Sequence, residues 1–453
     1  MGRSTVIRPG DDATMRGSTI TRARAFRAAL GTLALAGCGT DQPTAPPPTA
    51  ATCITGLSAQ ATCYSGTQLS GASYQIAVPT NWNGILVVVA RGATPVPATD
   101  LRTFGAARNL LRDGGLALAA TTYRSDTPLA RDATDDVEEL RQIFVAKFGR
   151  PKRTIVWGLS FGGLVAARCA ERFGTFDGVV SLCGLMAGTL RSLYTQLDAR
   201  TVYQYYCRNL PRSDEPRYDL FLGLAPQTTL TAAELQARVN ECTGISLPAA
   251  QRSAAQRENL ANILAVLRIP ESGLLTNMDA ATALLKTFLQ ETLGGHNPLQ
   301  NTNVRYSGST DDVALNRDVP RYPAENQTAT VLASADDPTG RPRAPVLTLH
   351  AIDDPRAFVE NQSAYRAAVT KAGALGNLFQ AFTNQGGHCQ FTTAEQLGAL
   401  QVVLDWIERK TPPTNEALAA ACEKYRLEFG TSCRFNAGYQ PAALETRLYP
   451  RQP

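Results

Sequence analysis

A serine between two glycines is the strongest candidate for covalent chemistry in this chain. Ser160 stands between Gly158 and Gly162, after the apolar run 154–157 and before the small residues of an expected helix. A strand that turns this sharply into a helix leaves no room for side chains two residues before and after the serine, which accounts for both glycines. The hydroxyl then lies at a helix N-terminus, where backbone N–H groups favour a developing oxyanion. The pattern predicts that Ser160 is a nucleophile.

A serine hydroxyl needs an adjacent base, and this chain has only 3 histidines to provide one. His388 lies in a glycine-bearing loop that follows the predicted strand 378–382. We interpret His350, which ends an earlier predicted strand, as a packing residue, and His296 as part of a surface turn. The sequence therefore predicts that His388 is the general base.

A carboxylate must orient that imidazole, and two candidates follow the strand that ends at His350. Asp353 and Asp354 stand side by side before Pro355. Either of them gives the chain order serine, acid, histidine, with each residue in a loop that follows a strand.

This order resembles the α/β-hydrolase superfamily. The resemblance extends over about residues 74–412 and includes the segment 78–84 that leads into the predicted strand 85–90. It implies a mostly parallel sheet flanked by helices, an acyl-enzyme mechanism and no cofactor. Because resembling enzymes place the acid directly before a proline, it also favours Asp354 over Asp353.

The resemblance further implies two backbone N–H donors for the oxyanion. The first would be Phe161, which follows the serine. The second is expected around Gly92 and Ala93, after the predicted strand 85–90. In relatives this strand usually ends in His-Gly, whereas here Arg91 precedes the glycine.

Strand-like and helical patterns alternate along the chain and predict the sheet that would position these residues. The predicted strands are 73–78, 85–90, 116–123, 154–157, 178–182, 346–350 and 378–382, and the predicted core helices are 101–112, 135–148 and 397–408. We assign the hydrolase core to residues 53–183 and 345–410. The tail 411–453 is expected to lie across the surface.

Residues 184–344 separate two core strands and are too many for a loop. A capping box from Thr231 to Glu234 and apolar spacing through 260–267 predict helices, as does the segment 278–293. α/β-hydrolases commonly carry a cap at this position, so we expect a mainly helical lid over the site. Its aromatic residues either line the substrate pocket or form the core of the lid: Tyr203, Tyr205, Tyr206 and Phe221.

The 10 cysteines favour disulfides if the protein is exported, because extracytoplasmic compartments are oxidising. Two pairs are predicted because their members are close in the sequence: Cys53 with Cys63, and Cys422 with Cys433. Cys207 and Cys242 lie in the same inserted region, which makes them a third candidate pair. With Cys38 set aside as the expected site of acylation, Cys169, Cys183 and Cys389 remain, so one of these three is free. We favour a bridge from Cys183, which ends a strand near the nucleophile, to Cys389 beside His388.

The N-terminal segment resembles a bacterial lipoprotein signal. A basic stretch precedes the apolar run 28–36, which is too short to span a bilayer, and residues 35–38 have the small-residue pattern of a lipobox. We expect a signal peptide at 1–37, acylation of Cys38 and a Pro/Thr-rich tether at 38–52. The protein would then be exported and anchored to the membrane through its lipid, at the outer membrane in a Gram-negative cell. The alternative is a secreted protein with a chance cysteine.

Charge and composition exclude other classes of partner. The formal net charge is +5, and residues 1–37 hold six arginines and two aspartates, so +5 minus +4 leaves +1 for the remainder. No basic patch predicts a nucleic-acid partner, and no close set of His, Cys and carboxylates predicts a metal site.

The most economical function is therefore that of a serine hydrolase acting on small-molecule carboxylic esters. One alternative is a serine aminopeptidase or prolyl-type peptidase, which would hold the amine of its substrate with acidic residues of the lid. The candidates are Glu234, Glu241, Glu258, Asp279 and Glu291. A second alternative is a lipoprotein that binds a ligand with an inactive hydrolase fold.

Overall fold

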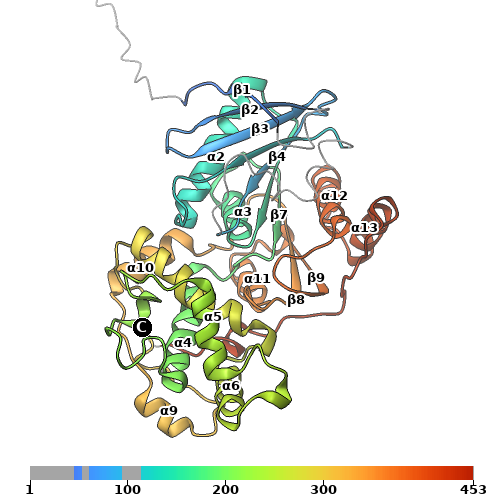
Figure 1. The fold of residues 1–453 in the computed structure, drawn as a ribbon. Coiled ribbons are helices and arrows are strands. Elements are labelled where there is room, and N and C mark those ends of the chain that lie inside the picture. Colours follow the sequence, from blue (N-terminus) through green and yellow to red (C-terminus); the bar gives the residue numbers. More distant parts are fainter. Residues whose placement is uncertain (1–44, 54–60, 94–113, 452–453) are drawn as a thin grey trace, which may run out of the picture. The chain divides into compact units, whose positions relative to one another are not determined.

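The computed structural model describes residues 45–53, 61–93 and 114–451 (Figure 1). The predicted signal peptide, the acylation of Cys38 and the predicted helix 101–112 lie outside these residues. Within the described part of the chain, we find no helix with the length and apolar character needed to cross a membrane.

A nine-stranded sheet forms the centre of the fold, in the order β1-β2-β3-β5-β4-β6-β7-β8-β9. The strands β1, β2, β3 and β5 pair antiparallel, whereas all pairings from β5 through β4 to β9 are parallel. The strands are β1 (Thr49–Ala51), β2 (Ala61–Thr67), β3 (Ser73–Pro79), β4 (Ile85–Ala90), β5 (Ala117–Thr121), β6 (Arg153–Leu159), β7 (Gly178–Leu182), β8 (Val346–Asp353) and β9 (Leu378–Gly386). This sheet confirms the predicted fold class, a mostly parallel sheet flanked by helices.

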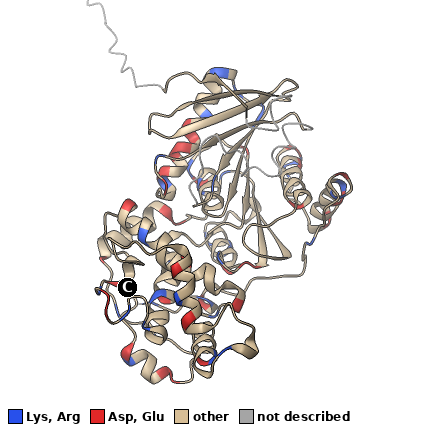
Figure 2. Cartoon of the chain, viewed as in Figure 1, with Lys and Arg blue, Asp and Glu red and all other residues tan. Residues whose placement is uncertain are grey.

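Helices cover both faces of this sheet, which explains why its central strands read as continuous apolar runs. Along β4, Leu86 and Val88 pack toward α2 (Ala130–Phe148), α3 (Phe161–Arg172) and α11 (Asn361–Lys371). The alternate residues Val87 and Val89 pack toward α12 (Thr393–Arg409). Charged residues accordingly concentrate on helices and loops rather than on the strands (Figure 2).

Between β7 and β8 the chain forms a helical insertion, for which we keep the predicted bounds 184–344. Its helices are α4 (Thr189–Cys207), α5 (Ala232–Thr243), α6 (Ala254–Leu267), α7 (Leu274–Asp279), α8 (Leu285–Thr287), α9 (Asp312–Asp318) and α10 (Asn326–Asp336), with π-helical turns at Ala280–Leu284 and Phe288–Thr292. The predicted capping box between Thr231 and Glu234 starts α5. Val202, Ile263 and Met278 belong to a core of the insertion that is separate from the two cores of the sheet.

In the part of the chain that the structure describes, four disulfides join the cysteines that the sequence analysis paired. The bonds are Cys53–Cys63, Cys183–Cys389, Cys207–Cys242 and Cys422–Cys433. Among the described residues, Cys169 is the free cysteine, and burial raises the pKa of its thiol.

Two expectations about the ends of the chain are wrong. The first is that residues 38–52 form an unfolded tether. This is wrong for the end of that segment, because Thr49–Ala51 form β1 and pair with β2. The edge of a sheet offers unpaired backbone groups, so such a strand needs no apolar sequence.

The tail is more than a surface segment. After α13 (Asn415–Phe429), which packs on α12, it runs from the sheet onto the insertion and ends in dark red in Figure 1. Leu444, Leu448 and Tyr449 of this segment are buried. These apolar residues are few and irregularly spaced, so no periodic pattern in the sequence predicted that they would be buried.

Candidate active site

The turn between β6 and α3 places Ser160 in a backbone conformation that side chains rarely adopt, with φ 56° and ψ −122°. The flanking glycines are required by close approach. A Cβ on Gly158 would lie 1.9 Å from the carbonyl oxygen of Gly162, and a Cβ on Gly162 would lie 2.0 Å from that of Ala90. The local sequence therefore forces the serine out of the strand and toward the carboxyl edge of the sheet.

The three residues predicted from the sequence meet at this edge, each in or beside the turn that follows a parallel strand. Ser160 Oγ–H donates to His388 Nε2 over 2.8 Å, and His388 Nδ1–H donates to Asp354 Oδ2 over 2.8 Å. Asp353, the other acidic candidate, is exposed at the end of β8. The structure thus brings Ser160, His388 and Asp354 into one hydrogen-bonded chain.

Backbone groups fix the orientation of the Asp354 carboxylate. Its Oδ1 accepts the N–H groups of Arg356 and Ala357, both at 2.9 Å, and its side chain is fully buried. The imidazole of His388 keeps 19% of its surface exposed. The acid is therefore held rigidly from inside the protein, while the histidine reaches a solvent-accessible face.

The two remaining histidines are outside this hydrogen-bonded chain, although His350 Nε2 lies 3.8 Å from Asp354 Oδ2. His350 is fully buried, donates from Nε2 to the carbonyl of Ala357 at 2.6 Å and accepts at Nδ1 from Gln362 Nε2 at 2.8 Å. Burial lowers its pKa, so it remains neutral and braces the loop that carries Asp354. His296 is exposed beside Glu325 on the insertion, 2.7 Å from its carboxylate.

The disulfide between Cys183 and Cys389 links the loop of His388 to the end of β7, the strand beside that of Ser160. Cys183 directly follows β7, and Cys389 directly follows His388. The two sulfurs and the His388 ring lie within 4.8 Å of one another, a spacing that would suit a metal ion. Because both sulfurs are consumed in the disulfide, they supply no thiolate ligand, and this cluster does not fit a metal site.

The end of β4 approaches the serine from the other side. A Cβ on Gly92 would lie 3.6 Å from Ser160 Cβ, and Phe161 is the first residue of α3, where N–H groups lack intrahelical partners. Arg91 is buried and donates to the carbonyl oxygens of Thr122 at 2.8 Å and Gly92 at 3.0 Å. The C=O of Gly92 and the N–H of Ala93 belong to one trans peptide, in which the two bonds point in opposite directions. Because the guanidinium of Arg91 binds this C=O, the N–H of Ala93 points away from the guanidinium.

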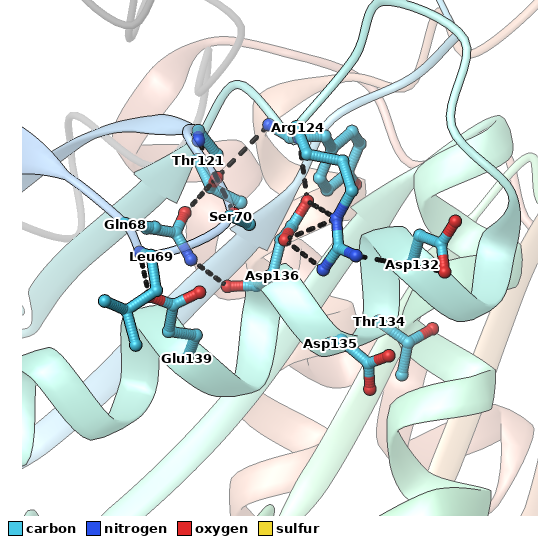
Figure 3. Close-up of polar contacts among 12 residues, drawn as sticks. Gln68, Leu69, Ser70, Thr121, Arg124, Asp132, Thr134, Asp135, Asp136 and Glu139 are labelled. Atoms are coloured by element: carbon cyan, nitrogen blue, oxygen red, sulfur yellow. Dashed lines mark hydrogen bonds and ion pairs between the residues drawn. The ribbon is translucent and has the colours of Figure 1, made fainter. Parts of the chain in front are cut away.

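A second network, which the sequence analysis did not identify, holds the turn 122–126, whose carbonyl groups accept from Arg91. Figure 3 shows Gln68, Arg124 and Asp136 of this network. Asp136 of α2 is fully buried and accepts from the backbone N–H of Arg124 at 2.8 Å and from its guanidinium at 2.7 Å. The carbonyl of the same aspartate accepts from Gln68 Nε2 at 2.7 Å. Helix α2 and the β2–β3 turn therefore fix the carbonyl groups that Arg91 binds.

Ser160 and His388 open into a cavity of about 230 Å³. The insertion contributes residues such as Gln196 and Asn277 to its wall, and the tail contributes Leu444 and Leu448. A smaller apolar cavity adjoins it and is lined in part by Phe161, Leu193 and Phe288. None of the four aromatic residues considered for a pocket lines either cavity in the described part of the chain; Tyr203 is buried in the core of the insertion.

Comparison with known proteins gives distant similarities. No protein-family model matches the chain. The chain is 22% identical over 432 residues to an o-phthalyl amidase of Xanthobacter agilis, which covers 81% of this chain and 92% of the relative.

Among solved structures, tannin acyl hydrolase from Aspergillus niger matches 78% of this chain and 79% of its own, with 13% identity and a TM-score of 0.45. An acylaminoacyl peptidase in complex with a chloromethyl ketone matches 80% of this chain, with 10% identity and a TM-score of 0.42. The chain spans 44% of the length of that peptidase.

Proposed function

We propose that the protein is a serine hydrolase that cleaves carboxylic esters through an acyl-enzyme on Ser160. The observation that carries the proposal is the continuous hydrogen-bonded chain from Ser160 through His388 to Asp354, opening into a cavity. Nucleophile, base and orienting acid at hydrogen-bond distance are the requirements for acyl transfer by serine.

In the first half-reaction, His388 Nε2 takes the proton of Ser160 as its oxygen attacks the substrate carbonyl. Asp354 holds the Nδ1–H tautomer and stabilises the imidazolium. The backbone N–H groups of Phe161 and Ala93 are our proposed donors to the oxyanion, and Gly92 lets the backbone approach. His388 then returns the proton to the leaving group, and a water molecule activated by the same imidazole releases the acyl group.

Amide hydrolysis is the second candidate, because the relative at 22% identity is named as an amidase. A nitrogen leaving group needs protonation by His388 but no additional residue, so the same site accommodates both reactions. An aminopeptidase is less well supported. Among the described residues that line the cavity there is no Asp or Glu to hold a substrate ammonium group. The five acidic residues considered for that role are therefore not part of the cavity wall.

Covalent labelling tests the proposal. A fluorophosphonate should label the wild-type protein at Ser160, whereas Ser160→Ala should be unlabelled and should lose turnover of phenyl esters. Ser334→Ala, an exposed serine on α10, is the matched control and should be labelled as the wild type is. Labelling that persists in Ser160→Ala would contradict the assignment of the nucleophile, and turnover of aryl amides faster than of the matching esters would favour the amidase.

We also propose export and lipid anchoring at Cys38, on the basis of the lipobox-like sequence. The four disulfides are consistent with an oxidising compartment. Cys38→Ser expressed in a Gram-negative host should appear in the soluble envelope fraction, whereas the wild type should remain with membranes. If both fractionate alike, the anchor is absent.

A further inference from the structure

We propose that Arg356 binds a carboxylate of the substrate, so that the site is built for esters or amides that carry a negative charge near the scissile carbonyl. The inference rests on the proposed function and names its substrate class. Two arginines, Arg191 and Arg356, and no carboxylate line the cavity within the described part of the chain. Its wall is therefore positively charged beside the nucleophile.

The backbone of Arg356 is held firmly at the site. Its N–H donates to Asp354 Oδ1 at 2.9 Å, and the preceding carbonyl, that of Pro355, accepts from Asn277 Nδ2 at 2.8 Å. Asn277 belongs to α7 of the insertion, so this segment is fixed by both the acid and the insertion. These contacts fix the backbone from which the Arg356 side chain extends.

Arg356 is partly buried and lines the cavity with Ser160 and His388, and its guanidinium has no hydrogen bond, ion pair or ring contact with any residue that the structure describes. The neighbouring arginine differs. Arg191 is exposed, donates to the carbonyl of Ala187 at 2.8 Å, and its charge acts on Asp337. Of the two cations in the wall, only Arg356 has all its N–H donors available to a ligand.

A planar guanidinium with five donors fits a carboxylate in a bidentate pair, and such a pair is stronger in a partly enclosed site than in water. Arg356 and Ser160 line one cavity of about 230 Å³, so the carboxylate must lie within a few bonds of the reacting carbonyl. The adjoining apolar cavity beside Phe161 and Phe288 would receive an uncharged part of the substrate.

Matched esters test this assignment. Phenyl 4-carboxybenzoate carries the charge on the acyl group, 4-carboxyphenyl benzoate carries it on the leaving group, and the 4-carbamoyl isostere of each is neutral. The para position prevents the carboxylate from attacking its own ester. We expect at least one carboxylate ester to have a kcat/KM at least about tenfold above that of its neutral isostere, chiefly through a lower KM. Which of the two esters shows this preference identifies whether the acyl group or the leaving group of the substrate carries the charge.

The variants separate Arg356 from general charge effects. Arg356→Gln should reduce this ratio to about one, and Arg356→Lys should retain part of it. Arg366→Gln removes the same charge from an exposed site on α11 and should keep the ratio. A ratio near one in the wild type for both arms, a ratio that survives in Arg356→Gln, or an equal loss in Arg191→Gln would overturn the proposal.

Two readouts keep this proposal distinct from the proposed function. Turnover of the neutral carbamoyl esters that disappears in Ser160→Ala supports the hydrolase whatever Arg356 does. Calorimetric titration of Ser160→Ala protein with terephthalate measures anion binding without catalysis, and the double variant with Arg356→Gln should bind it at least about tenfold more weakly. Binding that is unchanged in the double variant would exclude an anion site at Arg356 even if the esters are cleaved.

Discussion

The two sides of the cavity are built in different ways. The proposed catalytic side takes Ser160, Asp354 and His388 from the turns that follow β6, β8 and β9 of one mostly parallel sheet, and a chain of side-chain hydrogen bonds joins the three residues. The opposite wall is formed by the insertion and the tail. These two segments are joined by contacts such as that between Asp198 and Arg451, which are more than 250 residues apart in the sequence. The comparison suggests that the sheet fixes the chemistry, whereas long-range contacts set the shape and charge of the pocket.

The largest effect is expected on the catalytic side. Asp354→Asn should lower kcat for a neutral phenyl ester by about 10⁴-fold, because an amide cannot hold the imidazole tautomer that accepts the serine proton. Asp353→Asn, one residue earlier and exposed, should change kcat by less than about twofold. Equal losses in the two variants would mean that the acid has been misassigned.

The disulfide at the histidine loop should matter for both stability and rate. Cys183→Ala with Cys389→Ala opens a link between residues 206 positions apart, so we expect a loss of about 4 kcal/mol in the free energy of unfolding. Displacement of His388 should lower kcat by about tenfold as well. The matched double variant at Cys207 and Cys242 lies within the insertion and should lose stability while keeping kcat, as urea unfolding and steady-state kinetics would show.

The tail should stabilise the wall through one buried ion pair. Arg451 lies 2.6 Å from Asp198 on α4, and both side chains are only 6% exposed. Arg451→Met leaves the Asp198 charge buried without its cation, which should cost about 3 kcal/mol and raise KM more than it lowers kcat.

The control for that pair is Arg426→Met, because Arg426 forms an exposed ion pair with Glu423 on α13. No measurable change in unfolding is expected for this variant. If Arg451→Met behaves in the same way, the tail is not a structural part of the wall.

The smallest effect should depend on pH and concerns the junction between the insertion and the sheet. Asp336 of α10 accepts the N–H of Ala130 at 2.7 Å, and burial raises its pKa to about 7. The native protein thus retains a proton that the unfolded chain loses near pH 4, and this contribution to stability falls as pH rises from about 4 to about 7.

Asp336→Asn should therefore raise the free energy of unfolding by about 2 kcal/mol at pH 8 and change it little at pH 4. Urea unfolding at several pH values would measure the difference. Asp214→Asn, at an exposed position, should show no such trend. A gain in Asp336→Asn that is constant with pH would contradict titration of Asp336 as the cause.

Much of the fold was predictable because its signals are local. The apolar runs of β4 and β6, the glycines around Ser160 and the capping box at Thr231 depend on neighbours within a few residues. The chain order of serine, acid and histidine, each after a strand, predicted that the three residues lie at one edge of the sheet, because parallel strands have their carboxyl ends at the same edge. The preference for Asp354 over Asp353 came from the proline that follows, and the structure places only Asp354 in contact with His388.

The pocket could not be predicted in this way. Arg91 reads as an ordinary charged residue, and only the fold shows that it is buried against the carbonyl groups of Thr122 and Gly92. Arg356 follows the acid by two residues, yet its open position depends on Asn277, 79 positions earlier in the chain. Leu444 gave no periodic signal at all, although it lines the cavity.

The sequence by itself determined the strand-to-helix turn at the serine, the parallel sheet and the three side chains at its edge, because backbone sterics and apolar periodicity act over short distances. Only the tertiary structure decided which residues face the nucleophile across the cavity. That choice depends on packing and buried charge pairs between segments far apart in the chain, and no local pattern encodes which of them will meet.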